Sequence, residues 1–224
     1  MKALFLNGSP RKNFNTASLL KKAMDGAKEV GAETELIHLY DYEYTGCKSC
    51  FACKIKGSKC NGLCAIRDSL RPVLEKAFEA DVIVIGSPVY FNAPTGQVRS
   101  FLERLLFPID TYMKDAEGHR ITVPHKMVHT GFIYTMNCPQ NFMDQIDYYT
   151  KLGDTPEEVG RLMGTNEILY SYDTYQFTDY DRYDVNMFTK EAKQKQRDEQ
   201  FPKDEKAAYE MGARLVRKAK ESAA

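Results

Sequence analysis

The stretch Lys2-Ala3-Leu4-Phe5-Leu6-Asn7-Gly8-Ser9-Pro10-Arg11-Lys12-Asn13-Phe14-Asn15-Thr16 opens the chain and decides its fold. A short apolar run ends in a small, polar, basic loop, and the residues after it show the apolar spacing of a helix. The pattern predicts a strand, a loop and a helix. In such a loop, backbone N–H groups and hydroxyls point at an anion, while the helix N-terminus and Arg11 add positive charge. The sequence therefore predicts a phosphate site.

This loop differs from the two common phosphate motifs. Gly8 is not followed by the second glycine and the Gly-Lys pair of a Walker A loop, and the G-x-G-x-x-G spacing of dinucleotide-binding folds is absent. A hydroxyl-rich loop suits a terminal phosphate monoester rather than a pyrophosphate. The alternative interpretation is a polar turn between strand and helix without a ligand.

Length and composition narrow the class of protein. The 224 residues suffice for one sizeable α/β domain with an extension. Lys plus Arg and Asp plus Glu both number 31, and the resulting zero net charge argues against a nucleic acid or membrane-surface partner. No apolar stretch approaches the length of a membrane span, and the first apolar run is too short for a signal peptide. We expect a cytoplasmic protein with reduced thiols.

Strand and helix patterns alternate along the rest of the chain. Further strands are expected at 33–39, 81–86, 126–134 and 167–171. Further helices are expected at 66–78, 95–106, 141–163 with a break near 153–156, and 201–219. The alternation predicts an α/β fold with a doubly wound, five-stranded parallel sheet in the order 2-1-3-4-5 and helices on both faces. We expect one domain over residues 1–224, with a cysteine-rich loop at 40–64 and a C-terminal extension from about residue 173.

Polar loops follow the first, third and fourth expected strands. The second loop reads Ser87-Pro88-Val89-Tyr90-Phe91-Asn92, and the third reads Thr135-Met136-Asn137. In doubly wound sheets, ligands bind at the carboxyl ends of the strands, beside the point where the strand order reverses. We therefore expect the three loops to converge on one ligand.

Two of these loops carry a family resemblance. Asn7-Gly8-Ser9-Pro10-Arg11 with Asn15-Thr16, followed by Gly86-Ser87-Pro88-Val89-Tyr90-Phe91, resembles the NAD(P)H-dependent FMN reductase branch of the flavodoxin-like superfamily. The loops match in the right order, each after a suitable strand, and the resemblance covers about residues 1–137. It implies a flavodoxin-like fold and bound FMN.

The resemblance also implies which residues bind FMN. The phosphate would be held by Ser9, Arg11, Asn15 and Thr16. The isoalloxazine ring would be wrapped by Pro88, Val89, Tyr90, Phe91 and Asn92, with Thr135, Met136 and Asn137 as a third wall. Such a ring needs flat apolar cover and a few polar contacts at its edge, and these loops offer both. The alternative for the two aromatic residues is core packing at a strand end.

The loop at 40–64 concentrates five of the six cysteines in the spacing C-x2-C-x2-C-x6-C-x3-C. Its compact start is shared by iron–sulfur cluster loops. The loop resembles that of the iron–sulfur flavoproteins, relatives of the FMN reductases, and this implies a 4Fe–4S cluster on Cys47, Cys50, Cys53 and Cys60. Cys64 is an alternative fourth ligand. A structural zinc site and a loop of free thiols without metal stay open, although zinc ribbons separate their cysteine pairs more widely.

The resulting prediction is an FMN-dependent oxidoreductase. The resemblance implies that NAD(P)H delivers hydride to the flavin, that electrons pass to a small-molecule or protein acceptor, and that a cluster would divide them into single steps. It also implies a homodimer or homotetramer, for which the connection at 107–123 and the Tyr- and Asp-rich stretch 173–184 offer contacts. Two alternatives are an FMN electron carrier without a nicotinamide site and a metal-binding or redox-sensing module without flavin.

Overall fold

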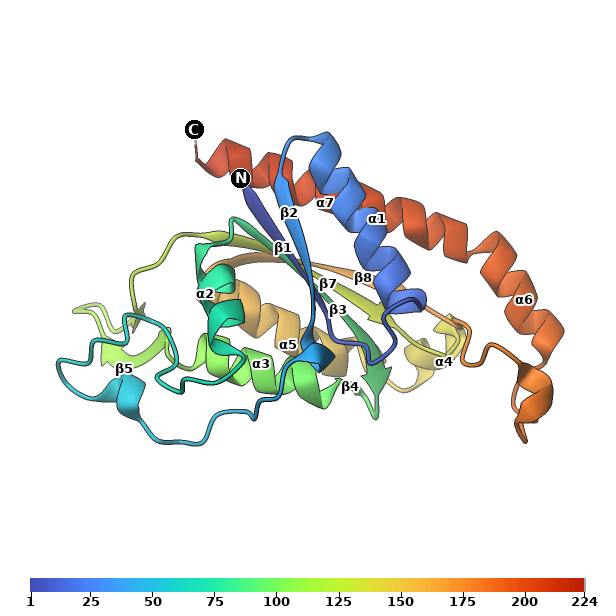
Figure 1. The fold of residues 1–224 in the computed structure, drawn as a ribbon, viewed down its shortest axis with the longest axis horizontal. Helices are drawn as coiled ribbons and strands as arrows, with labels where there is room; N and C mark the ends of the chain where they lie inside the picture. The colour runs from blue at the N-terminus through green and yellow to red at the C-terminus, as the bar shows by residue number, and fades with distance from the viewer. Residues whose placement is uncertain (224) are drawn as a thin grey trace.

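The computed structural model describes residues 1–223, and a parallel sheet lies at its centre (Figure 1). The sheet is built from β1 (Lys2–Asn7), β2 (Glu33–His38), β3 (Val82–Tyr90), β7 (Val128–Thr135) and β8 (Gly164–Ser171). These strands pair in parallel in the order β2-β1-β3-β7-β8. This order is the predicted 2-1-3-4-5, so the flavodoxin-like, doubly wound α/β fold is confirmed.

Helices cover both faces of the sheet (Figure 1). One face packs against α1 (Asn15–Glu29) and α7 (Phe201–Ser222), and the other packs against α2 (Arg71–Glu79), α3 (Gly96–Leu106) and α5 (Tyr148–Met163). Alternate residues of a strand point to opposite faces, so Phe5 joins the α1 and α7 side while Leu4 and Leu6 join the other. Two apolar cores result, which explains the uninterrupted apolar runs of the strands.

The contact between α1 and α7 is close enough to require glycine on both helices. A Cβ atom on Gly26 would lie 2.0 Å from the Tyr209 carbonyl oxygen, and one on Gly212 would lie 1.9 Å from the Ala23 carbonyl oxygen. The two backbones therefore touch, and no side chain fits between them. Because the first loop leads directly into α1, this contact fixes the position of the predicted phosphate site.

Two helices differ from the sequence predictions. The helix expected at 66–78 begins only at Arg71, because the Asp68 carboxylate accepts a hydrogen bond from the Leu70 N–H and holds the chain in a turn. The helix expected at 141–163 is divided into α4 (Gln140–Gln145) and α5. The division lies at Asp147, whose φ of 51° cannot continue a right-handed helix, and not at 153–156, where Pro156 lies inside α5.

Smaller elements complete the chain. The connection at 107–123 forms a hairpin of β5 (Asp110–Lys114) and β6 (Arg120–Thr122), and β4 (Ala93–Pro94) pairs with the end of β3. Helix α6 (Lys190–Glu199) consists almost entirely of polar residues, so no apolar periodicity predicted it. Short 3-10 turns are η1 (Leu39–Asp41), η2 (Ala52–Lys54) and η3 (Tyr180–Arg182). No helix within residues 1–223 has the length and apolar character that a membrane crossing needs.

Candidate functional site

The three predicted loops meet at the carboxyl edge of the sheet. Gly8 donates its N–H to the Gly86 carbonyl at 2.8 Å, and the Thr95 hydroxyl donates to the Gly8 carbonyl at 2.8 Å. The hydroxyls of Thr16 and Thr135 lie 2.7 Å apart, and both side chains are buried. The first loop therefore contacts the segments that carry the second and third loops, as expected for one ligand site.

The first loop is shaped by Asn7, the last residue of β1. The Asn7 Oδ1 accepts from the Ser9 N–H at 3.0 Å, and its Nδ2 lies 2.9 Å from the His38 Nδ1. Burial lowers the pKa of His38, with Lys12 lowering it further and Asp41 opposing, so the neutral ring accepts this bond. The roles of Asn7 and His38 were missed, although an Asn that ends a strand before a Gly is a usable signal.

The start of α1 leaves donors available for an anion. Its N-cap residue Phe14 provides no side-chain cap, so the first N–H groups of the helix are not satisfied in that way. Ser9, Asn15 and Thr16 are buried around this helix start, whereas Arg11 is exposed. A helix N-terminus of this kind, with hydroxyls beside it, fits a phosphate monoester.

Two predicted phosphate ligands also contact the distant stretch 173–184. Arg11 Nη1 donates to the Gln176 carbonyl at 2.8 Å, and Asn15 Nδ2 donates to the Tyr175 carbonyl at 2.8 Å. Arg197 of α6 donates to Asn15 Oδ1 at 3.3 Å. Both side chains keep further N–H donors. The Tyr- and Asp-rich stretch thus lies beside the first loop, which no sequence period indicated.

The second loop is a hairpin and not the irregular loop expected from Ser87 onward. Strand β3 continues to Tyr90 and pairs antiparallel with β4, and the turn between them holds Phe91 and Asn92 at φ values of 50° and 66°. Left-handed backbone at a bulky residue is uncommon and gathers at functional sites. Phe91 is fully exposed and Tyr90 is 46% exposed, so neither ring packs in the core. Both remain available as flat apolar cover.

The third loop offers an acceptor without a donor. Thr135 and Met136 are buried, and Asn137 is half-buried. The Asn137 Oδ1 is buried and has no hydrogen-bond partner within residues 1–223. Buried polar atoms are nearly always satisfied, so this one calls for a bound group that carries an N–H or O–H donor. The ring imide and the ribityl hydroxyls of FMN are donors of this kind, so the residues present fit FMN.

The cysteine-rich loop is spread along irregular backbone beside α3. Cys50 is exposed, Cys47, Cys53 and Cys60 are half-buried, and Cys64 is buried. No three cysteine sulfurs within residues 1–223 lie within 4.8 Å of one another. A single zinc ion, with Zn–S bonds of about 2.3 Å, would bring its thiolates to about 3.8 Å. The observed positions of the cysteines within residues 1–223 do not form such a site.

Both ends of this loop are held by Arg104 of α3, whose side chain is fully buried. Arg104 donates to the two carboxylate oxygens of Asp68 at 2.5 and 3.0 Å, to the Ile66 carbonyl at 3.1 Å and to the Thr45 carbonyl at 3.4 Å. Farther along the loop, Lys54 donates to the carbonyls of Phe107 and Asp110. Two cationic side chains, Arg104 and Lys54, therefore anchor the loop through hydrogen bonds that involve none of its cysteines.

Known proteins match the part of the chain that carries these loops. The sequence profile of the NADPH-dependent FMN reductase family matches residues 1–122, which is more than half of the 224 residues. The chain belongs to this family. An iron–sulfur flavoprotein of Archaeoglobus fulgidus is 47% identical over 104 residues, covering 46% of this chain and 48% of that protein. One of Methanocaldococcus jannaschii is 39% identical over 104 residues, covering 46% and 51%.

The match spans about half the length of these curated relatives. Solved structures extend the likeness in fold to nearly the whole chain of this FMN reductase family member. The NAD(P)H:quinone oxidoreductase from Methanothermobacter marburgensis has a TM-score of 0.66 and 13% identity, covering 96% of each chain. Azoreductase AzrA has a TM-score of 0.64 and 12% identity, covering 96% of this chain and 100% of its own.

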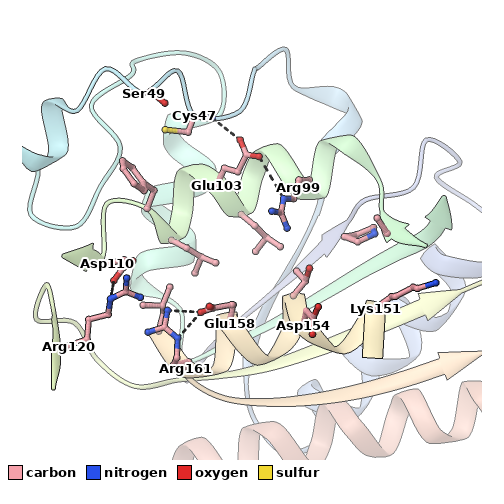
Figure 2. Close-up of a pocket in the computed structure, with 17 residues that line it drawn as sticks. Cys47, Ser49, Arg99, Glu103, Asp110, Arg120, Lys151, Asp154, Glu158 and Arg161 are labelled. Atoms are coloured by element: carbon pink, nitrogen blue, oxygen red, sulfur yellow. Dashed lines mark hydrogen bonds and ion pairs between the residues drawn. The ribbon is translucent and has the colours of Figure 1, made fainter. Parts of the chain in front are cut away.

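This family member also has a cavity of about 910 Å³ between α3 and α5 (Figure 2). The apolar part of its wall includes Leu102, Leu106 and Leu162. Ion pairs around it join Arg99 to Glu103 at 3.7 Å, Arg120 to Asp110 at 3.3 Å and Arg161 to Glu158 at 2.6 Å. The cavity reaches Cys47 and Ser49 on one side and Ala93 and Pro94 of β4 on the other. The cavity thus lies between the cysteine-rich loop and the hairpin of β3 and β4.

Proposed function

We propose that this protein is an FMN-dependent oxidoreductase that takes hydride from NAD(P)H and passes electrons to an acceptor. The observation that carries the proposal is the meeting of three loops at the carboxyl edge of the sheet: the start of α1 has no side-chain cap, and in the third loop the Asn137 Oδ1 lacks a donor. Membership of the NADPH-dependent FMN reductase family supports it, as do the iron–sulfur flavoproteins and quinone oxidoreductase among the similar proteins.

The first loop would hold the phosphate of FMN. Ser9, Thr16 and the first N–H groups of α1 would donate hydrogen bonds, and Arg11 would add a full positive charge. Asn15 has one amide hydrogen beyond the bond to Tyr175, so it can contribute a donor while it holds the stretch beside it. The dianionic group would thus be surrounded by donors from one short segment.

The hairpin and the third loop would hold the ring. The ring would be wrapped by Pro88, Val89, Tyr90, Phe91 and Asn92, with Thr135, Met136 and Asn137 as a third wall. When bound, FMN supplies the capacity to accept hydride and to release electrons. The chain itself binds and orients the ring, and no side-chain acid or base is required. We also propose a homodimer or homotetramer, as the resemblance to the FMN reductases implies.

The cysteine-rich loop would hold a 4Fe–4S cluster on Cys47, Cys50, Cys53 and Cys60. Support comes from the similarity to the iron–sulfur flavoproteins and from the compact cysteine spacing. Cys60 is half-buried, whereas Cys64 is only 8% exposed and its carbonyl accepts from Arg71. This difference favours Cys60 as the fourth ligand. Such a cluster would lie beside the cavity that reaches Cys47.

The first experiment compares FMN with riboflavin, which lacks only the phosphate. Wild-type protein is purified without oxygen, and flavin dissociation constants are measured by fluorescence quenching. We expect FMN to bind at least about tenfold more tightly than riboflavin, because the phosphate gains charge-assisted hydrogen bonds. Steady-state oxidation of NAD(P)H by the FMN-loaded protein, with a quinone added to reoxidise the flavin, separates the reductase from a pure electron carrier. Failure to bind FMN, or equal affinity for both flavins, would contradict the proposal.

A second experiment tests the cluster. Iron and acid-labile sulfide are assayed in anaerobic wild-type protein, where we expect about four of each per chain. Cys50→Ser should lose most of this iron, whereas Cys138→Ser, which changes a half-buried cysteine outside the loop, should retain it. Iron-free wild-type protein with normal FMN binding would leave the reductase intact and exclude the cluster. Equal iron in both variants would exclude the assigned ligand set.

A further inference from the structure

A short segment after β8 is joined to the third loop by backbone hydrogen bonds. This segment, residues 171–176, is called the strap below. Met136 donates its N–H to the Ser171 carbonyl at 3.0 Å, Asp173 donates to the Cys138 carbonyl at 3.0 Å, and Thr174 donates to the Met136 carbonyl at 2.9 Å. The strap therefore extends the pairing of β7 with β8 past the ends of both strands.

The other end of the strap reaches the first loop. The Tyr175 carbonyl accepts from Asn15, and the Gln176 carbonyl accepts from Arg11. Helix α6 also contacts the strap, because Gln196 donates to the Tyr172 carbonyl at 3.2 Å. The strap thus joins the first and third loops along the edge where FMN would bind.

Lys193 of α6 is the buried cation in this arrangement. Its side chain is 1% exposed, and its ammonium donates to the Asn137 carbonyl at 3.1 Å and to the Asp173 carboxylate. The ammonium also lies 4.7 Å from the centre of the Phe188 ring. Two hydrogen-bond acceptors and one aromatic ring therefore lie around the ammonium. A buried lysine ammonium needs a charged or hydrogen-bonding partner, and removing one member of a buried ion pair destabilises the folded protein.

Two details connect Lys193 to the flavin site and not only to general stability. Lys193 holds the main-chain carbonyl of Asn137, the residue whose side-chain Oδ1 has no donor. It also holds Asp173, whose φ of 50° lies in the left-handed region and needs surrounding contacts to persist. A change at Lys193 would therefore move the Asn137 acceptor and loosen the strap on which Arg11 and Asn15 are fixed.

We infer that the strap and α6 form part of the FMN site and that Lys193 is a positioning residue for it. This inference rests on the proposed function. The family profile ends at residue 122, so this contribution comes from a part of the chain outside the match. Lys193 itself contacts the third loop and the strap, so its effect on FMN is through Asn137 and Asp173.

The test measures FMN binding by the full-length Lys193→Met variant, which keeps the length of the side chain and removes its charge. We expect the FMN dissociation constant to rise at least about tenfold, because the loop and strap lose their common anchor. The change should appear mainly as weaker FMN affinity, since Lys193 itself touches no reacting atom. Lys193→Arg should recover part of the affinity. Lys195→Met, an exposed lysine on the same helix, should match wild type.

A second variant separates positioning from folding. Asp173→Asn removes the partner carboxylate with little change in volume, and Lys193→Met/Asp173→Asn should bind FMN no more weakly than Lys193→Met alone. Urea unfolding of each apoprotein gives the folded fraction. Wild-type affinity in Lys193→Met, or a loss that the unfolded fraction accounts for, would overturn the inference while the proposed function stands. Absence of FMN binding by wild type would instead overturn the proposed function.

Discussion

The buried side chain of His129 is expected to make the stability of the folded protein depend on pH. His129 in β7 is 4% exposed, and its ring nitrogens lie 2.9 Å from the Thr165 hydroxyl and 3.1 Å from the Ser222 hydroxyl. Burial lowers the pKa of His129, Lys218 lowers it further, and Glu167 opposes. The folded protein therefore favours the neutral ring.

This preference predicts a loss of stability in mild acid. The free energy of unfolding should fall as the pH drops below about 6.5, because the unfolded chain then takes up the proton before the folded chain does. The loss should level off below the lowered pKa of the folded state. Urea unfolding at pH 7.5 and pH 5.0 should show a smaller difference for His129→Gln than for wild type. The exposed residue His119 supplies the control His119→Gln, and an unchanged difference in His129→Gln would contradict the argument.

At the residue scale, the sequence predicted which residues lie at the candidate site better than it predicted their hydrogen-bond partners. Small polar residues after apolar runs predicted that Ser9, Thr16 and Thr135 lie at one edge of the sheet, because parallel strands end on the same side. The bond between Arg11 and Gln176 joins residues 165 positions apart and was not predictable. The stretch around Gln176 has no period from which its path could be inferred.

Among the elements, the cysteine-rich loop depends on α3 for its shape. Arg104 joins Thr45 near the start of the loop to Ile66 and Asp68 just after it, so one buried guanidinium holds both ends. Burial opposes ionisation of the Asp68 carboxyl, but the hydrogen bonds and charge of Arg104 prevail and lower its pKa. Between these ends, Lys54 holds the loop by donating to the Phe107 and Asp110 carbonyls.

Removal of this cation should therefore loosen the loop selectively. We expect Arg104→Met to destabilise the protein by about 3–5 kcal/mol, because Asp68 would be left without its charged partner. Limited proteolysis should then cut first within residues 45–68. Arg99→Met, on the same helix, changes a residue whose side chain is 62% exposed and should cost less than about 1 kcal/mol. Equal stability of the two variants would show that Arg104 does not anchor the loop.

The elements that the sequence predicted well share a clear signal. Apolar runs flanked by polar loops located the five strands of the main sheet, and helical spacing located α1, α3 and α7. Helix α6 and the division at Asp147 were missed for physical reasons. The first lacks an apolar face, and the second depends on a left-handed residue that aspartate tolerates but does not require.

At the level of the whole molecule, the contact between α1 and α7 closes one side of the sheet. Gly26 and Gly212 allow the two backbones to touch, and each would place a Cβ against a backbone oxygen of the other helix. Backbone atoms cannot relieve such an overlap by rotating, as a side chain can. The order of strands follows from alternating strands and helices, but this glycine pair could be recognised only from the structure.

Substitution at the contact should therefore separate the two helices. We expect Gly212→Ala to cost about 3 kcal/mol in the free energy of unfolding, since the added methyl group would overlap the Ala23 carbonyl. FMN affinity should fall as well, because the proposed phosphate donors lie at the start of α1. Gly96→Ala is the control, because nothing lies within 4 Å of its added Cβ. A Gly212→Ala protein as stable as Gly96→Ala would contradict the close contact.

The pairing of α1 with α7 also has a consequence for biosynthesis. The Lys220 ammonium donates to the Val30 carbonyl across 190 residues of sequence, so the partner of α1 is translated long after α1 itself. Until α7 has left the ribosome, the nascent chain keeps the apolar side of α1, including Leu19 and Ala23, open to chaperones. We expect α1, which is proposed to bind the flavin phosphate, to reach its final position only after α7 has emerged, so that stable cofactor binding would follow the synthesis of α7.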